Sequence, residues 1–463
     1  MKSVLSIAAA CLLIALPASA RSRTSGVDWT RFGYDSARHS SAPGSGITTA
    51  NAAMLTRQQV HLDGTVDSSP IYLHDVLVHG VEHDTFFVTT TYGKTEALDA
   101  STGLLLWRFT PPAYARLAGS AQITTATPVA STDRTAIYAA ASDGRIRKLR
   151  VADGKVLWTT TITHDATHEK ITSSLNVSRG LVIATTGGYY GDAPPYQGHV
   201  VTVSERTSLI AHVWNSLCSD RHTLIVPRTC SSSDSAIWSR NGAAVDPSNG
   251  TLVVATGNGP FNGRTDWGDS VLVLSPDASR LLRHWTPGNQ KALEASDADL
   301  GSTSPALLGG GYAVQGGKDG KLRLLQLHRL PGVNARTGGE LQTVPTPGGS
   351  GLFSAPAIWK GTWVFVATDG GTAAWLLSGG RLHSVWSNGN GGTSPVVVGS
   401  LLYVAGSGSV NVYVPTSGKQ VANLPSGSVH WQSPIVADGR VAMPEGNAND
   451  HATTGVLDIY RLP

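Results

Sequence analysis

The stretch "LDASTGLLLWRFTP" at residues 98–111 decides the fold. It holds an Asp, a Thr-Gly turn and a Trp within an apolar run, a pattern typical of a chain that reverses between two β-strands. Similar phrases return as "VADGKVLWTTTI" (151–162), "LLSGGRLHSVWS" (376–387) and "YVPTSGKQVANL" (413–424). A phrase that recurs in this way predicts a repeat protein.

A second motif, which we call the anchor, also recurs along the chain. It is a Ser/Thr-x-Pro or Ser-Pro sequence followed by apolar residues, with two weaker forms that lack the Pro. The strong anchors are "SSPIYL" (68–73), "TATPVA" (125–130), "TSPALL" (303–308), "SAPAIW" (354–359), "TSPVVV" (393–398) and "QSPIVA" (432–437), and the weak ones are "SSLNVS" (173–178) and "NGAAVD" (241–246).

Each anchor opens a unit of four short antiparallel strands. A Val-, Ile-, Tyr- and Ala-rich run follows it, then Gly or Asp-Gly, then an alternating run and the turn phrase. The last two units are spaced about 39 residues apart, and a period of roughly 40–50 residues with four strands indicates a β-propeller. Eight anchors therefore predict an all-β, eight-bladed propeller of four-stranded blades, with seven blades as the alternative count.

The two ends of the chain should close this ring. The last unit supplies only three strands, whereas "LTRQQVHL" (55–62) precedes the first anchor and has no blade of its own. We expect residues 55–62 to be the outermost strand of the last blade. The segment "DWTRFGYDSARHSSAP" (28–43), here called the strap, should then cross one face with Trp29 and Phe32 buried. The chain thus divides into a signal peptide (1–20), an N-terminal segment with the strap (21–54) and the propeller (55–463).

The N-terminal sequence and the net charge indicate where the protein is located and which classes of partner it can bind. The first twenty residues, "MKSVLSIAAACLLIALPASA", place one Lys before an apolar run and end in Ala-Ser-Ala, which predicts a secretory signal peptide cleaved near Ala20 and a secreted or periplasmic protein. No later run reaches the roughly 20 apolar residues of a membrane span. A net charge of +3 on 463 residues is too small to indicate nucleic-acid binding. We expect a monomer.

Export leaves two cysteines, Cys218 and Cys230. A pair of cysteines in an oxidising compartment is expected to form a disulfide, here within the segment 217–241.

The turn phrases, the anchors and the opening Trp-x-x-Phe resemble the pyrroloquinoline-quinone (PQQ) type repeat propellers over residues 28–463. The resemblance implies the propeller fold. It leaves function open, because quinoprotein dehydrogenases, the assembly scaffold BamB and other exported proteins share the architecture. The dehydrogenases carry an adjacent Cys-Cys pair, a Trp beneath the quinone, and a Glu/Asn/Asp calcium site with an Asp base. The cysteines here are not adjacent, so neither PQQ nor Ca²⁺ is the expectation, although both stay open.

The long insertions predict which face is functional. In a propeller the loop between the second and third strands of a blade, and the link from its last strand to the next blade, emerge on the same face. All the long insertions are interpreted as such loops or links, and long loops often carry function. They span residues 186–199, 217–241, 257–270, 288–304, 330–349 and 445–455.

Eleven residues in these insertions are candidates for a ligand site. Flat apolar area beside carboxylates and amides suits a sugar, a quinone or a peptide. The alternative is that the insertions pack on one another and cap the channel. Asp297, Asp299 and Asn258 are also weak Ca²⁺ candidates, because hard cations prefer oxygen ligands, but a hydrogen-bonded turn carboxylate is the favoured interpretation. The candidates are Tyr189, Tyr190, Tyr196, Trp238, Asn258, Phe261, Arg264, Asp266, Trp267, Asp297 and Asp299.

Three functions follow from these observations. The first is a non-catalytic propeller that binds a small molecule, glycan or envelope protein on the loop-bearing face, with no catalytic residues assigned. The second is a PQQ-dependent oxidoreductase, and the third is a BamB-like envelope assembly scaffold. The sequence favours the first.

Overall fold

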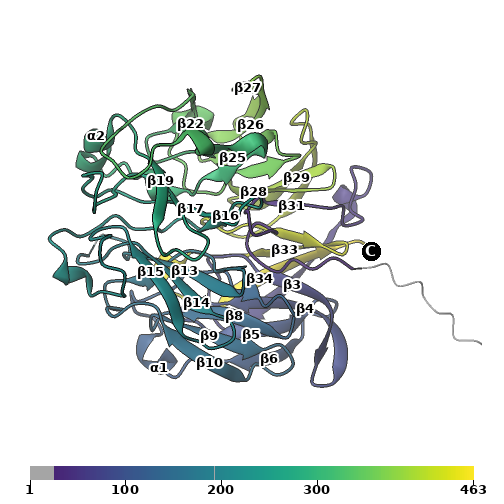
Figure 1. Ribbon diagram of the computed structural model, residues 1–463. Coiled ribbons are helices and arrows are strands. Elements are labelled where there is room, and N and C mark those ends of the chain that lie inside the picture. The colour runs from purple at the N-terminus through teal and green to yellow at the C-terminus, as the bar shows by residue number, and fades with distance from the viewer. Residues whose placement is uncertain (1–25, 192) are drawn as a thin grey trace, which may run out of the picture.

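The computed structural model describes residues 26–191 and 193–463, so the expected signal peptide lies outside the described residues. Eight antiparallel sheets of four principal strands each are arranged in a ring (Figure 1), which confirms the eight-bladed propeller over the seven-bladed alternative. Each predicted anchor leads into the innermost strand of one blade, so the eight anchors and the eight blades correspond one to one.

The strands of the blades follow chain order, from the innermost to the outermost. In blades 1 to 4 they are β3 Ile71–Val78, β4 Val81–Thr89, β5 Thr95–Asp99 and β6 Leu105–Phe109; β7 Val129–Ala130, β8 Ala136–Ala141, β9 Arg145–Arg150 and β10 Val156–Thr161; β12 Asn176–Ser178, β13 Leu181–Gly187, β14 His199–Ser204 and β15 Ile210–Asn215, with β11 Lys170–Ile171 also on β13; and β16 Ala244–Val245, β17 Leu252–Ala255, β18 Val271–Leu274 and β19 Leu281–Trp285.

Blades 5 to 7 repeat this order, and blade 8 takes its outermost strand, β2, from the start of the chain. Their strands are β20 Ala306–Leu307, β21 Tyr312–Gln315, β22 Lys321–Gln326 and β23 Gln342–Pro345; β24 Ala357–Trp359, β25 Trp363–Thr368, β26 Gly371–Ser378 and β27 Arg381–Asn388; β28 Thr393–Val398, β29 Leu401–Gly406, β30 Ser409–Tyr413 and β31 Gln420–Pro425; and β32 Ile435–Ala437, β33 Arg440–Pro444, β34 Gly455–Arg461 and β2 Thr56–Leu62.

Helices are few and short. None of the described helices is long and apolar enough to cross a membrane. They are α1 Tyr114–Leu117 and α2 Gln290–Ala295, with 3₁₀ turns η1 Ala52–Met54, η2 Pro227–Thr229, η3 Leu300–Ser302, η4 Gly309–Gly311, η5 Leu327–Arg329, η6 Pro347–Gly349 and η7 Ala448–Asp450.

The hydroxyl groups of the anchors join neighbouring blades around the axis. Ser69 donates a hydrogen bond to the carbonyl of Ser433 (2.8 Å), and Thr125 donates to the carbonyl of Thr172 (2.6 Å). Thr303 donates in the same way to Ser354 (2.9 Å). All these groups are buried, so each hydroxyl satisfies a backbone carbonyl that water does not reach. The Ser and Thr of the anchor therefore hold the inner ends of adjacent blades together.

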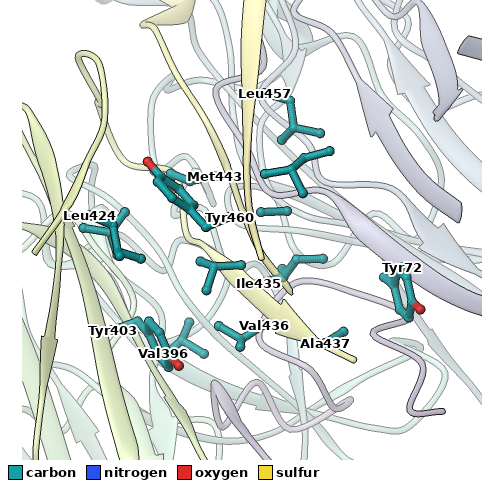
Figure 2. Packing of buried hydrophobic residues seen from close by; sticks show 14 of the residues in the cluster. Tyr72, Val396, Tyr403, Leu424, Ile435, Val436, Ala437, Met443, Leu457 and Tyr460 are labelled. Carbon is teal, nitrogen blue, oxygen red and sulfur yellow. The ribbon is translucent and has the colours of Figure 1, made fainter. Parts of the chain in front are cut away.

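The closing strand is β2, as predicted. All seven of its residues pair antiparallel with β34, from Thr56 opposite Arg461 to Leu62 opposite Gly455. Figure 1 shows the C-terminal strands, in yellow, beside the first strands of the chain. One large apolar cluster then spans blades 7, 8 and 1, and Figure 2 shows Tyr403, Met443 and Tyr460 among its members. Ring closure thus buries apolar surface on both faces of the last blade.

The strap crosses the end of the channel that is opposite the long loops, where it pairs with the innermost strands, anchor residues included. Trp29 exchanges two backbone hydrogen bonds with Tyr72 of β3 (2.8 Å each), and β1 (Ser41–Ala42) pairs parallel with β28. Trp29 and Phe32 are buried, as expected from the sequence. The buried Arg38 guanidinium donates to the carbonyls of Phe32, Ser174 and Leu175 at 2.7–3.0 Å. We call this side the strap face and the opposite side the loop face.

Five of the six insertions are the predicted loops and links, but the interpretation of residues 330–349 is wrong. That segment contains β23, the outermost strand of blade 5, and residues 330–341 connect it to β22. The connection runs along the neighbouring blade, where the His284 ring contacts the carbonyls of Gly332 and Arg336 at 2.9 and 3.2 Å. The sequence concealed β23 because only four residues pair and their burial is shallow.

Candidate functional site

Three aromatic side chains meet on the loop face at the mouth of the channel. The rings of Phe353 and Trp431 are stacked with centroids 5.2 Å apart, and the Trp238 ring is tilted against both at 6.3 and 5.6 Å. Each side chain comes from the link that precedes a different blade, and all three are half-buried. The links therefore bring flat apolar area to the axis, where a planar group could pack.

A buried ion-pair network lies beside these rings. Arg240 Nη2 contacts Asp67 Oδ1 at 3.1 Å, and the Arg240 guanidinium lies 4.9 Å from the centroid of the Trp431 ring. His430 Nδ1 contacts the other Asp67 oxygen at 2.7 Å. Burial alone would raise the pKa of Asp67, but Arg240 and His430 outweigh it and lower that pKa to about 2. Asp67 is therefore ionised throughout the physiological range.

A second charged group lies on the other side of Trp238. The Lys318 ammonium contacts Asp299 Oδ2 at 2.6 Å and Asp297 Oδ1 at 2.9 Å, and it lies 5.7 Å from the centroid of the Trp238 ring. The backbone N–H of Asn258 donates to Asp299 Oδ1 at 2.6 Å. Gly257 permits this approach, because a Cβ there would lie 2.3 Å from that same carboxylate oxygen.

The environment of this pair shifts both pKa values. Burial raises the pKa of Asp299, although Lys318 opposes the shift. Burial would lower the pKa of Lys318, but Asp299 and Asp297 outweigh it and raise that pKa. A buried carboxyl group whose pKa is shifted by desolvation and by a charged partner is a candidate functional group.

A cavity of about 370 Å³ opens beside the rings of Phe353 and Trp431, with Thr368, Asp369 and Ser407 in its wall. A larger cavity of about 540 Å³ lies on the strap face, along the turn Gly309–Gly311. We place the candidate site at the channel mouth beside the smaller cavity. Phe353, His430 and Trp431 line that cavity, and the two ion pairs lie against the same group of aromatic rings.

Four of the eleven predicted ligand-site residues lie together at this mouth. Trp238, Asn258, Asp297 and Asp299 come from the link before blade 4, the loop of blade 4 and the link before blade 5. Asp297 is exposed, whereas Asp299 is buried. The Lys318 ammonium lies between the two carboxylates that were the weak Ca²⁺ candidates.

The other seven have different surroundings within the insertions. Trp267 is buried and donates from Nε1 to Ser219 Oγ at 3.0 Å, with Phe261 packed against its ring at 5.8 Å. Asp266 accepts the backbone N–H of Cys218 at 3.2 Å. Tyr189 and Tyr196 are buried, whereas Tyr190 and Arg264 are exposed. Most of these side chains thus pack the insertions on one another, which was the alternative interpretation.

The predicted disulfide joins Cys218 to Cys230. It closes a short loop within the link between blades 3 and 4, on the same rim as Asp266.

The sequence analysis missed Asp67, Arg240, Lys318, Phe353, His430 and Trp431. A signal was present for four of them. Asp67, Arg240, Phe353 and Trp431 each occupy the position immediately before an anchor. Because the innermost strand starts on the loop face and the anchor leads into it, the residue before the anchor lies at the channel mouth. Bulky or charged residues at that position would have identified the site.

Comparison of the sequence with known proteins supports the propeller fold and finds similarity to two groups of proteins. The family model of the outer membrane protein assembly factor BamB matches residues 48–215. A curated relative, the quinohemoprotein alcohol dehydrogenase ADH IIB of Pseudomonas putida, is 24% identical over 57% of this chain and 40% of its own length. A quinone alcohol dehydrogenase subunit of Gluconobacter oxydans is 23% identical over 56% of this chain and 37% of its own. The chain thus aligns with about two fifths of these relatives.

Solved structures confirm the propeller fold. Quinohemoprotein alcohol dehydrogenase from Comamonas testosteroni superposes with a TM-score of 0.69 at 17% identity, over 94% of this chain and 80% of that one. A europium-containing methanol dehydrogenase gives 0.70 at 15% identity over 95% and 99%. BamB from Moraxella catarrhalis gives 0.56 at 12% identity over 88% and 98%. The anchors, the eight closed blades and these matches together support a PQQ-repeat β-propeller that is similar to the quinoprotein dehydrogenases and to BamB.

Proposed function

We propose that the channel mouth binds a planar, carboxylate-bearing ligand, and that the quinone cofactor named for the relatives is the first compound to test. The observation that carries this proposal is the half-exposed Trp238 ring with the Lys318–Asp299 ion pair against it. An aromatic ring packs against a flat ligand, and an ammonium group fixes the position of its carboxylate or quinone oxygen.

The donor set also suits a hard divalent cation beside such a ligand. Asp297 and Asp299 supply carboxylate oxygens, and Asn258 adjoins them through its backbone N–H on Asp299. Hard cations prefer oxygen ligands of this kind. Binding there requires Lys318 to leave at least one carboxylate and to turn toward the ligand, for which its flexible four-carbon chain is suited.

The second part of the proposal concerns catalysis. A bound quinone supplies two-electron oxidation of an alcohol. Asp299 is the one of the two carboxylates that is buried, and its raised pKa suits a group that accepts the proton of a substrate hydroxyl. We propose this redox activity as the alternative to a binding role without turnover.

The experiment is a titration of purified protein with PQQ, in the presence and absence of Ca²⁺, followed by quenching of tryptophan fluorescence and by calorimetry. We expect one site per chain, and at least tenfold weaker binding in Trp238→Ala and Lys318→Gln. Tyr190→Ala is the matched control, because Tyr190 is 84% exposed on the rim and outside the mouth. Equal affinity in all four proteins would overturn the proposed site.

Dye reduction with primary alcohols then separates catalysis from binding. In an oxidoreductase, Asp299→Asn retains PQQ and loses most of kcat, while Asp266→Asn on the outer rim retains both. Tight binding without dye reduction in the parent protein would leave the non-catalytic role.

The match to the BamB family model favours one further candidate, a scaffold that contacts an envelope protein. The exported location predicted from the sequence is proposed with it. Cross-linking in intact cells tests the partner, and N-terminal sequencing of the protein recovered outside the cytoplasm tests cleavage near Ala20.

A further inference from the structure

A cluster of metal-binding side chains lies on the strap face, at the seam where the ring closes. His74 comes from β3, Asp84 from β4 and Asp438 from the turn between β32 and β33. One ligand atom of each lies within 4.8 Å of the others. His74 Nδ1 is 2.9 Å from Asp84 Oδ1 and 3.1 Å from Asp438 Oδ2. The cluster therefore joins the first blade to the last.

The geometry of His74 is that of a ligand rather than of a hydrogen-bonded pair. Its Nδ1 atom is buried and close to two carboxylates, yet it forms no aligned hydrogen bond with any residue that the structure describes. Its other ring nitrogen, Nε2, lies 3.3 Å from Asp75 Oδ2. A carboxylate on the second nitrogen fixes the ring and its tautomer in most metal-binding histidines.

Neighbouring groups hold the two carboxylates in place. The Tyr72 hydroxyl donates to Asp438 Oδ2 at 2.8 Å, and the backbone N–H of Val27 donates to Asp438 Oδ1 at 3.0 Å. The backbone N–H of Asp75 and the Arg440 guanidinium contact the two oxygens of Asp84, each at 3.2 Å. The residue just before the strap, the first blade and the last blade thus all contribute to one small site.

From this arrangement we propose that His74, Asp84 and Asp438 bind one Zn²⁺ ion, with water as the fourth ligand. One neutral imidazole and two carboxylates match the charge and the ligand preference of Zn²⁺, whereas Ca²⁺ and Mg²⁺ favour oxygen-only sites. The ion holds the strap and the last blade against the first blade. Because it binds the closed ring and not the separated blades, it stabilises the folded state.

The test uses the whole protein stripped with a chelator. Zinc is titrated against a chromophoric competitor, and the thermal midpoint is measured with Zn²⁺, Ca²⁺ or Mg²⁺ alone. We expect one zinc per chain, a rise in the midpoint with Zn²⁺ only, and at least tenfold weaker binding in His74→Ala and Asp438→Asn. A crystal with zinc should give an anomalous peak within about 2.3 Å of His74 Nδ1.

His83→Ala is the matched control. His83 also contacts an Asp in blade 1, Asp99 at 2.7 Å, and its side chain is 23% exposed against 26% for His74. Asp75→Asn leaves all three ligands in place and should weaken zinc about 10–100-fold, so it replaces the ligand variants if they fail to fold. Equal zinc affinity in the parent and in His74→Ala or Asp75→Asn, or an anomalous peak elsewhere, would refute the site. The result is independent of the channel mouth, which lies on the opposite face.

Discussion

The Trp107 indole packs against Gly154 of the next blade. Its Nε1 donates to the carbonyl of Val151 at 2.7 Å, and a Cβ on Gly154 would lie 2.6 Å from its ring. Trp386 repeats the contact with Gly418 and the carbonyl of Pro415. The recurring Gly and Trp of the turn phrase are therefore the two halves of one contact between adjacent blades.

This contact predicts how a methyl group added at Gly154 changes the free energy of unfolding. Gly154→Ala should lower the free energy of unfolding by about 1–3 kcal/mol more than Gly180→Ala does, as measured by urea denaturation. Both glycines have positive φ, +71° and +75°, but Gly180 has no atom within 4 Å of the added Cβ. The difference between the two variants therefore isolates the loss of the Trp107 contact. Equal destabilisation would show that backbone strain alone matters.

The closing strand makes the same contact with different residues. On β2, Gln58 Nε2 donates to the carbonyl of Thr102 at 2.7 Å, and a Cβ on Gly103 would lie 2.6 Å from Val60. Val60→Asp places a charge in the apolar cluster of the seam and should cost about 2–4 kcal/mol of unfolding free energy. Hydrogen exchange should accelerate first in β2 and β34. His61→Asp, at an exposed position of the strand opposite Val456, should change neither quantity appreciably.

The sequence predicted the blades and their closure because those features are local and periodic. A Ser-Pro anchor or a Gly before Trp is visible wherever it recurs, and a chain with three strands in its last unit requires a fourth. The site is not local. Arg240 Nη2 lies 3.1 Å from Asp67 Oδ1 although 173 residues separate the two in the sequence. Neither link contains a sequence pattern that predicts this pairing. The Zn²⁺ cluster likewise joins residues near the two ends of the chain.

Asp269 predicts how stability depends on pH. Burial raises its pKa to about 8, with Asp299 adding to the shift and the N–H of Leu300 opposing it. The folded state thus holds a proton that the unfolded chain releases near pH 4. This group should therefore lower the free energy of unfolding by about 1.4 kcal/mol per pH unit from roughly pH 4 to pH 8, and no further above that.

Denaturation at pH 6, 7 and 9 measures this slope. Asp269→Asn keeps a neutral side chain of the same shape at every pH, so its stability should fall less than that of the parent between pH 6 and 9. Parallel pH profiles for the two proteins would mean that Asp269 is ionised in the folded state and that the buried Oδ2 atom has a partner.

The Cys218–Cys230 disulfide is expected to stabilise one link rather than the blades. The link that holds Cys218 is also fixed to the rim by other bonds: the N–H of Cys218 donates to Asp266, and the N–H of Ser219 donates to the carbonyl of Thr265 at 2.9 Å. Cys218→Ser should therefore loosen the segment around the exposed Arg228 and leave the blades intact. Trypsin should cut there at least ten times faster than in the parent. Global unfolding should stay a single cooperative transition, with a loss of up to about 3 kcal/mol from the greater entropy of the unfolded chain. A broad or biphasic transition would instead make this link a structural part of blades 3 and 4.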